Sequence, residues 1–166
     1  MISPTPNPRS VPSEARRKYL SFRQDRSRFA IALTSVREVL FLSKQQITPV
    51  PNTQPFLLGL TNLRGEILSV ADFGIFLGLK PVDSTQEESR ILVVEAPDPR
   101  DLTLPMMRVG LAISRVEGVV SLNPDKISSA ADASAEIVPF LQGLYNHQGD
   151  LLTIVDIEAI AHCPRW

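Results

Sequence analysis

Apolar and polar residues follow one another in short runs along this chain, and one such arrangement occurs twice. Residues 56–76, FLLGLTNLRGEILSVADFGIF, align with residues 140–160, FLQGLYNHQGDLLTIVDIEAI. In both segments, two apolar runs flank a polar turn that starts with Asn and ends with Gly. Because Gly adopts positive φ readily, this pattern predicts a β-hairpin. The Asp that follows each hairpin is suitably placed to cap a short helix.

The repeat extends upstream of the hairpin. Residues 28–47 align with residues 108–127, in the same order and at nearly the same offset. The two matches together indicate two copies of one unit of about 65–75 residues, which is typical of a duplicated small fold rather than a solenoid. A lone unit of this size buries a marginal core, so we expect the two copies to pack into a single body.

Each copy contains about five short stretches that favour β-strands. In the first copy these stretches are 18–24, 28–33, 36–42, 56–61 and 66–72. Residues 36–42 also fit one face of a helix, and the proline-rich segment 44–55 predicts an extended loop. The chain is therefore expected to be all-β with short helices. It would form two similar small five-stranded antiparallel β-barrels packed together, although a two-sheet sandwich fits the same strands.

These elements imply a domain organisation. Residues 1–17 hold four prolines and almost no apolar bulk, which predicts a disordered tail. A single domain then spans 18–162, with a first barrel at 18–82, a linker at 83–89 and a second barrel at 90–162. The connection at 97–106 is longer than its counterpart in the first copy, so we expect a mobile surface loop there.

Composition excludes several classes of function. The chain has 166 residues, of which 43% are hydrophobic, and its net charge is −1. It lacks the basic field that nucleic acid or an anionic membrane surface would attract, and no apolar run is long enough to span a bilayer. One cysteine and two histidines are too few for a typical structural zinc site. Without a signal-peptide pattern or a possible internal disulfide, we expect a cytoplasmic protein with no metal or cofactor.

Comparison of the two copies separates scaffold from candidate function. The Asn and Gly of the turn and the capping Asp occur in both copies, so we expect them to build the unit. Arg64 and Glu38 differ, because their counterparts are Gln148 and Gly118. An arginine at a hairpin tip presents an exposed, rigid fork of hydrogen-bond donors. Arg64 and Glu38 are therefore candidates for a paired-charge binding surface.

The strongest enzyme hypothesis is an aspartic-protease-like, two-lobed hydrolase that would use Asp72 and Asp156 as its dyad. That active site needs Asp-Thr-Gly or Asp-Ser-Gly, whereas these two aspartates are followed by Phe-Gly and Ile-Glu. The sequence also lacks the nucleophile-elbow, phosphate-loop, dinucleotide-binding and zinc-protease motifs. We therefore expect a binding protein and not an enzyme.

The hairpin segment GLTNLRGEILSVADFGIFLG closely resembles the signature of CheW-like domains, the scaffold of bacterial chemotaxis arrays. The preceding strand, its Val-x-Glu-Val sequence and its proline-rich run also fit that family. Further matching segments are 30–59, 109–127 and 140–160, and the resemblance covers about 18–162. Ser69 stands where the family commonly has a proline, and the 97–106 loop and the proline-rich tail are further departures.

This resemblance implies two five-stranded barrels with a hydrophobic groove between them and an adaptor function. Family members bind the cytoplasmic tip of a chemoreceptor, a methyl-accepting chemotaxis protein, and the regulatory domain of a CheA-type histidine kinase. The implied receptor-binding residues are Val36, Glu38, Asn62, Arg64, Ile91 and Leu92. The implied kinase-binding residues are Phe41, Ile47, Val50 and Pro51. The alternative is a small-barrel module that binds another protein or nucleic acid outside chemosensing.

Overall fold

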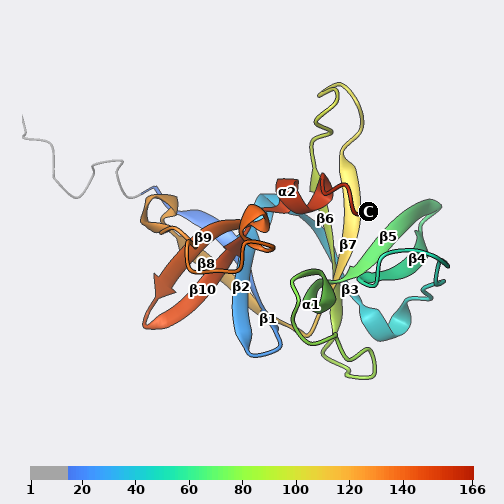
Figure 1. Cartoon of the computed structure of the whole chain (residues 1–166), viewed down its shortest axis with the longest axis horizontal. Helices are drawn as coiled ribbons and strands as arrows, with labels where there is room; N and C mark the ends of the chain where they lie inside the picture. Colours follow the sequence, from blue (N-terminus) through green and yellow to red (C-terminus); the bar gives the residue numbers. More distant parts are fainter. Residues whose placement is uncertain (1–14) are drawn as a thin grey trace, which may run out of the picture.

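The computed structural model describes residues 15–166, which form two five-stranded β-sheets and two short α-helices (Figure 1). Sheet A contains β1 (Arg17–Gln24), β2 (Ser27–Ala32), β8 (Arg115–Leu122), β9 (Leu141–His147) and β10 (Asp150–Val155). Sheet B contains β3 (Val36–Phe41), β4 (Leu57–Leu63), β5 (Glu66–Asp72), β6 (Arg90–Ala96) and β7 (Met107–Ile113). The helices are α1 (Phe73–Phe76) and α2 (Ile157–Ala161). In this part of the chain no helix has the length and apolarity needed to cross a membrane. The predicted tail at 1–17 falls, as far as residue 14, outside the described residues.

The strand order is β8-β1-β2-β10-β9 in sheet A and β3-β6-β7-β5-β4 in sheet B. Neighbouring strands are antiparallel except for the parallel pairs β2–β10 and β5–β7. The predicted all-β class with five strands in each half is confirmed. Two details of the predicted barrels are wrong. The sheets are not closed, because each has two free edge strands, and they are not fully antiparallel, because each contains one parallel pair. The parallel pairs join hairpins from different copies, so no tight turn dictates their relative direction.

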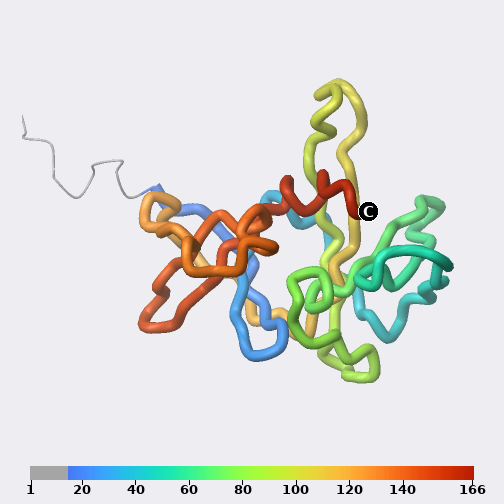
Figure 2. Tube along the Cα trace, in the orientation of Figure 1, coloured from blue at the N-terminus to red at the C-terminus, as the bar shows by residue number. Residues whose placement is uncertain are grey.

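The two sequence copies exchange strands between the sheets. The first copy contributes β1 and β2 to sheet A but β3, β4 and β5 to sheet B, and the second copy does the reverse. In Figure 2 the blue start of the chain accordingly lies beside the orange and red segments of its last third. The expected division into barrels at 18–82 and 90–162 does not match this order. The 83–89 segment instead connects α1 to β6 within the half that holds sheet B.

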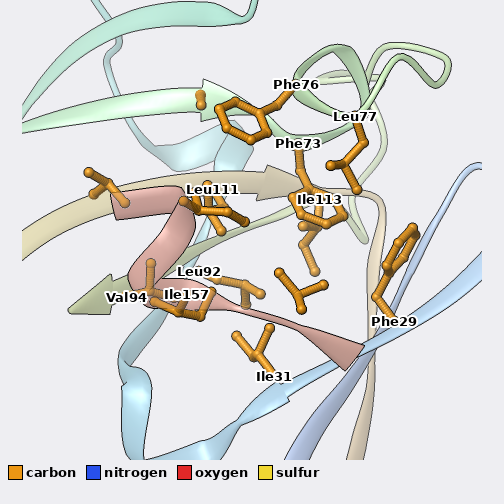
Figure 3. Packing of buried hydrophobic residues seen from close by; sticks show 14 of the residues in the cluster. Phe29, Ile31, Phe73, Phe76, Leu77, Leu92, Val94, Leu111, Ile113 and Ile157 are labelled. Atoms are coloured by element: carbon orange, nitrogen blue, oxygen red, sulfur yellow. The ribbon is translucent and has the colours of Figure 1, made fainter. Parts of the chain in front are cut away.

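The largest hydrophobic cluster lies between the two sheets (Figure 3). It takes side chains from β2, β6, β7 and both helices, and the rings of Phe29 and Phe73 meet edge to face with centroids 5.0 Å apart. A smaller cluster lies within each half, around Tyr145 and Leu152 in sheet A and around Leu42 and Leu68 in sheet B. Because the main core needs both sheets, the described chain is built as one cooperative unit.

The proline-rich segment at 44–55 runs beside β4 as the predicted extended crossover. Thr48 exchanges two backbone hydrogen bonds with Leu60, at 2.8 and 2.9 Å. Gly59 permits this approach, because a Cβ at that position would lie 2.2 Å from the carbonyl oxygen of Thr48. Gly143 approaches the corresponding crossover of the second copy in the same way, at 2.1 Å. These glycines explain why both copies share a bulge at this point of the hairpin.

Each hairpin ends in an aspartate that begins a helix. The carboxylate of Asp72 accepts a hydrogen bond from the N–H of Ile75 at 3.0 Å. The carboxylate of Asp156 accepts one from the N–H of Ala159 at 3.2 Å. The sequence prediction that both residues cap helices is therefore confirmed.

Candidate functional site

The β4–β5 turn presents Arg64 at one end of sheet B. Arg64 and Gly65 both have positive φ, +50° and +86°, and the flanking residues Leu63 and Glu66 form the last ladder pair. Asn62 stabilises the turn, because its Oδ1 accepts a hydrogen bond from the N–H of Gly65 at 2.8 Å. A two-residue turn with positive φ at both positions matches the right-handed twist of the strands. The sequence predicted the glycine conformation but not that of the arginine.

Arg64 forms an ion pair with Glu38 of β3. The Arg64 side chain is 69% exposed, whereas that of Glu38 is 26% exposed. Since β3 is an edge strand that pairs only with β6, this ion pair spans the open edge between β3 and the β4–β5 hairpin. An exposed ion pair contributes at most about 1 kcal/mol to stability. Both groups can therefore accept a new partner at small energetic cost.

Arg108 of β7 lies beside this pair and bridges two acidic side chains. Its guanidinium donates to Glu66 at 2.7 Å and to Glu95 at 3.1 Å. The hydrogen bond to Glu95 raises the pKa of Arg108, which keeps its charge fixed. A hollow of about 240 Å³ at this place is lined by Arg37, Glu38, Leu63, Arg64, Glu66, Val93 and Arg108. Its rim of mixed charge suits a polar protein surface better than a buried small molecule.

The equivalent place in sheet A shows which of these contacts belong to the scaffold. Arg28 pairs with Asp150 at 2.7 Å. Arg108 and Glu66 are their counterparts in the repeat and pair at the same distance. That ion pair is therefore part of the shared fold. The ion pair at the β4–β5 turn is specific to sheet B, because the equivalent positions in sheet A hold Gln and Gly.

Three of the six residues predicted to contact a receptor lie at this turn, and a fourth, Val36, lies two residues before Glu38 along β3. Glu38 and Arg64 form the ion pair, and Asn62 supports the turn from an exposed position. Val36 starts β3 and is half-buried, because one side of it packs against the central cluster. Glu38 and Arg64 line the same hollow, whereas Asn62 lines a neighbouring one and Val36 packs toward the core between the sheets.

Ile91 and Leu92 do not reach the surface. Neither side chain has any exposed area. Leu92 faces the cluster between the sheets (Figure 3), and Ile91 belongs to the smaller cluster of sheet B. Their strand, β6, lies between β3 and β7 and is covered on both faces. A partner could not touch these residues without opening the core, so we correct their assignment from receptor-binding to core residues.

The residues predicted to contact a kinase lie toward the other end of β3. Phe41 is 41% exposed, and the guanidinium of Arg90 and the ammonium of Lys44 lie 4.0 and 4.5 Å from the centre of its ring. Of the remaining three, Ile47 and Val50 are half-buried and Pro51 is exposed. Phe41 and Pro51 are the exposed members of this group, and the kinase assignment stays a prediction.

Asp72 and Asp156 are each bound within their own half of the molecule. Asp72 is buried and accepts hydrogen bonds from the N–H groups of Ile75 and Val82, at 3.0 and 2.9 Å. Burial raises the pKa of Asp72, and these hydrogen bonds partly counter that effect. Within residues 15–166 the two carboxylates share no hydrogen bond, and no group of three or more His, Cys, Asp or Glu side chains could hold a metal ion.

Sequence reasoning missed two exposed apolar residues of sheet B, Val39 and Ile67. Val39 is 41% exposed because β3 alternates half-buried and exposed positions. Ile67 lies opposite Asn62 in the hairpin and is 67% exposed. The alternation within 36–41 could have identified Val39. No comparable signal was present for Ile67, because its neighbour Leu68 is equally apolar but buried.

Comparisons with known proteins agree with this fold. A family model described as CheW-like domain matches residues 18–164. A chemotaxis protein CheW from Thermotoga maritima is 28% identical over 141 residues, which cover 85% of this chain and 85% of that protein. A probable chemotaxis protein CheW from Rhizobium etli is 26% identical over 145 residues, or 87% of this chain and 86% of that protein. The crystal structure of scaffolding protein TtCheW from Thermoanaerobacter tengcongensis is similar with a TM-score of 0.71 at 22% identity, covering 85% of this chain and 89% of that one.

Proposed function

The chain belongs to the CheW-like family, and on that premise we propose that it couples a chemoreceptor to a CheA-type histidine kinase in a bacterial chemosensory system. Its action is binding, without chemistry on a substrate. Support comes from the relatives named as chemotaxis proteins and from the fold shared with a scaffolding protein. The adaptor acts in the cytoplasm, at the inner ends of membrane-bound receptors, as a single folded unit.

The observation that carries the proposal is the ion pair between Glu38 and Arg64. It is exposed, it spans an open sheet edge, and it occurs in only one of two copies that otherwise share their scaffold. We assign Val36, Glu38, Asn62 and Arg64 to the receptor contact. A helical receptor tip would lay an apolar face beside Val36 while its polar groups accept hydrogen bonds from the guanidinium of Arg64.

The kinase contact is assigned to Phe41, Ile47, Val50 and Pro51. Phe41 presents an exposed ring between two cations, which suits a partner with an apolar anchor and acidic neighbours. Phe41 and Val36 lie at opposite ends of β3, and we propose that the two partners bind at the same time. This separation is what an adaptor requires.

Binding measurements on matched variants test the proposal. Purified cytoplasmic fragments of the chemoreceptors of the same bacterium, and the regulatory domain of its kinase, are titrated with wild type, Arg64→Ala and Phe41→Ser. We expect Arg64→Ala to weaken receptor binding at least about tenfold, as loss of a hot-spot residue does. Phe41→Ser should weaken kinase binding and spare the receptor.

The control is Gln148→Ala, which changes the equivalent turn of sheet A and should leave both affinities unchanged. Equal affinities for Arg64→Ala and wild type would remove Arg64 from the receptor contact. If folded wild-type protein binds neither partner, the family relationship predicts the fold of this chain correctly but not its function. The alternative of a module outside chemosensing would then replace the proposal.

A further inference from the structure

The connection between β6 and β7 is a ten-residue loop at 97–106, which we call the finger. It extends beyond the last ladder pair, Ala96 with Met107, and projects from the body of the protein (Figures 1 and 2). The equivalent connection in sheet A, between β1 and β2, consists of two residues, Asp25 and Arg26. The shared fold closes this hairpin without a finger, so folding alone does not explain its length.

Polar contacts connect the residues at the base of the finger. The side chain of Asp98 is only 4% exposed and accepts hydrogen bonds from the guanidinium of Arg100 at 2.6 and 3.0 Å. These hydrogen bonds lower the pKa of Asp98 to about 2, so the carboxylate is ionised at neutral pH. Nε2 of His162 lies 2.6 Å from the carbonyl oxygen of Pro97 and links the base to the segment after α2. A loop organised in advance loses less conformational entropy when it binds.

Beyond this base the finger exposes apolar side chains. Leu102 is 81% exposed, Leu104 is 42% exposed and Met106 is 43% exposed. Single exposed apolar residues are common on protein surfaces, but three within five positions on a projecting loop form a local patch of the kind that marks a protein-binding surface.

The finger rises from the end of sheet B that carries the Arg64 turn. Arg108, two residues after the finger, pairs with Glu66, which closes the β4–β5 turn beside Arg64. On the other side, Val36 pairs with Val94 near the end of β6 that leads into the finger. Half of a ten-residue loop can reach at most about 18 Å beyond its last ladder pair. Because Arg108 and Glu66 are paired, a partner seated on the turn would lie next to the base of the finger.

The kinase contact lies at the other end. Phe41 pairs with Arg90, the first residue of β6, whereas the finger follows the last residue of that strand. The five residue steps along β3 from Val36 to Phe41 correspond to about 17 Å. The position of the finger therefore favours the receptor over the kinase as its partner.

We propose that the finger is a second receptor-binding element, which places Leu102, Leu104 and Met106 on apolar side chains of the same helical receptor tip that contacts Arg64. This inference rests on the proposed function and extends the receptor site by a surface absent from the other half of the molecule. The finger makes the receptor contact bipartite: a charged part at the turn sets orientation, and an apolar part at the finger adds affinity and selects among receptors.

Two variants of the full chain test this proposal. The first carries Leu102→Ser, Leu104→Ser and Met106→Ser together, and the second replaces 97–106 with the Asp-Arg turn of β1–β2. The control carries Val119→Ser and Leu151→Ser, which change exposed apolar residues of sheet A. The same receptor fragments and kinase domain are titrated. We expect both finger variants to lose at least about tenfold in receptor affinity while kinase affinity stays within about twofold. The control should bind the receptor as wild type does.

The outcomes separate this inference from the function on which it rests. Weaker receptor binding by Arg64→Ala, with wild-type receptor affinity in both finger variants, would overturn the inference and leave the adaptor function standing. A selective loss of kinase affinity in the finger variants would overturn the choice of partner. Failure of wild type to bind any receptor would overturn both. The triple-serine variant changes only exposed side chains, so its thermal unfolding should match that of wild type and exclude misfolding as the cause.

Discussion

At position 64 an arginine occupies a backbone conformation that glycine adopts more easily. Gln148 has the same conformation in the equivalent turn, with φ of +53° against +50° for Arg64. The left-handed conformation therefore belongs to the turn and does not depend on the side chain at this position. The sequence could reveal Arg64 as a candidate, because its counterpart differs, but only the structure shows Glu38 beside it.

Substitution of the two turn residues separates stability from binding. Arg64→Gly and Gln148→Gly should each raise the free energy of unfolding by up to about 1 kcal/mol, because relief of the left-handed conformation outweighs the added chain entropy of glycine. Urea denaturation of both variants measures this change. Only Arg64→Gly should weaken receptor binding. Destabilisation by Arg64→Gly alone would show that its ion pair supports the fold.

The carboxylate of Asp98 makes the stability of the finger base depend on pH. Its pKa is lowered from 3.8 to about 2 by hydrogen bonds from Arg100. A lowered pKa in the folded state stabilises the protein at a pH above the unfolded value, and this contribution disappears as the pH falls towards about 2. Asp98→Asn should therefore lower the melting temperature at pH 7, and its difference from wild type should shrink between pH 4 and pH 2. A difference in melting temperature that is constant across this pH range would show that the charge of Asp98 does not contribute to stability.

At the scale of elements, the two helix-capping aspartates differ in the segments whose backbone N–H groups they bind. Asp72 accepts hydrogen bonds from the N–H of Ile75 in α1 and from the N–H of Val82 in the segment after α1. Asp156 accepts one hydrogen bond, from the N–H of Ala159 in its own helix. Asp72→Ala should cost about 2–4 kcal/mol and Asp156→Ala about 1 kcal/mol, since loss of a cap is joined at Asp72 by an unsatisfied backbone N–H. Chemical denaturation of both variants measures the difference. Equal costs would contradict the bridging role of Asp72.

Most elements were predictable from the sequence because their signals are local. The Asn-to-Gly turns, the capping aspartates and the proline-rich crossover each depend on residues within a few positions of one another. The helix considered for 36–42 did not form, because exposed and half-buried residues alternate there with the period of a strand. Burial of Ile91 and Leu92 was harder to foresee, since it depends on hydrophobic clusters that pack against the two faces of β6.

At the scale of the whole molecule, the exchange of strands between copies has no local signal. Strand propensity and alternation locate the strands but do not determine which strands pair. The same sequence pattern is therefore compatible with two contiguous barrels and with two sheets that exchange strands. The parallel contacts of β2 with β10 and of β5 with β7 decide between them. Each sheet consequently depends on both copies, and the largest cluster lies between the sheets.

This exchange predicts how the chain behaves when it is divided. Residues 1–82 and 83–166, produced separately, should each lack a cooperative thermal transition, because either fragment keeps isolated hairpins whose neighbours are in the other fragment, and a lone hairpin is marginally stable. Mixing the fragments should restore the transition and the near-ultraviolet circular dichroism of the intact chain. The intact protein cleaved within 83–89 is the control and should keep its fold, because that segment contains no strand and the pairings between the two parts stay in place. A cooperative transition in either fragment alone would mean that this copy can fold by itself. The exchanged sheets would then be a domain-swapped arrangement of units that can each fold alone, and the exchange would not be required to bury the core.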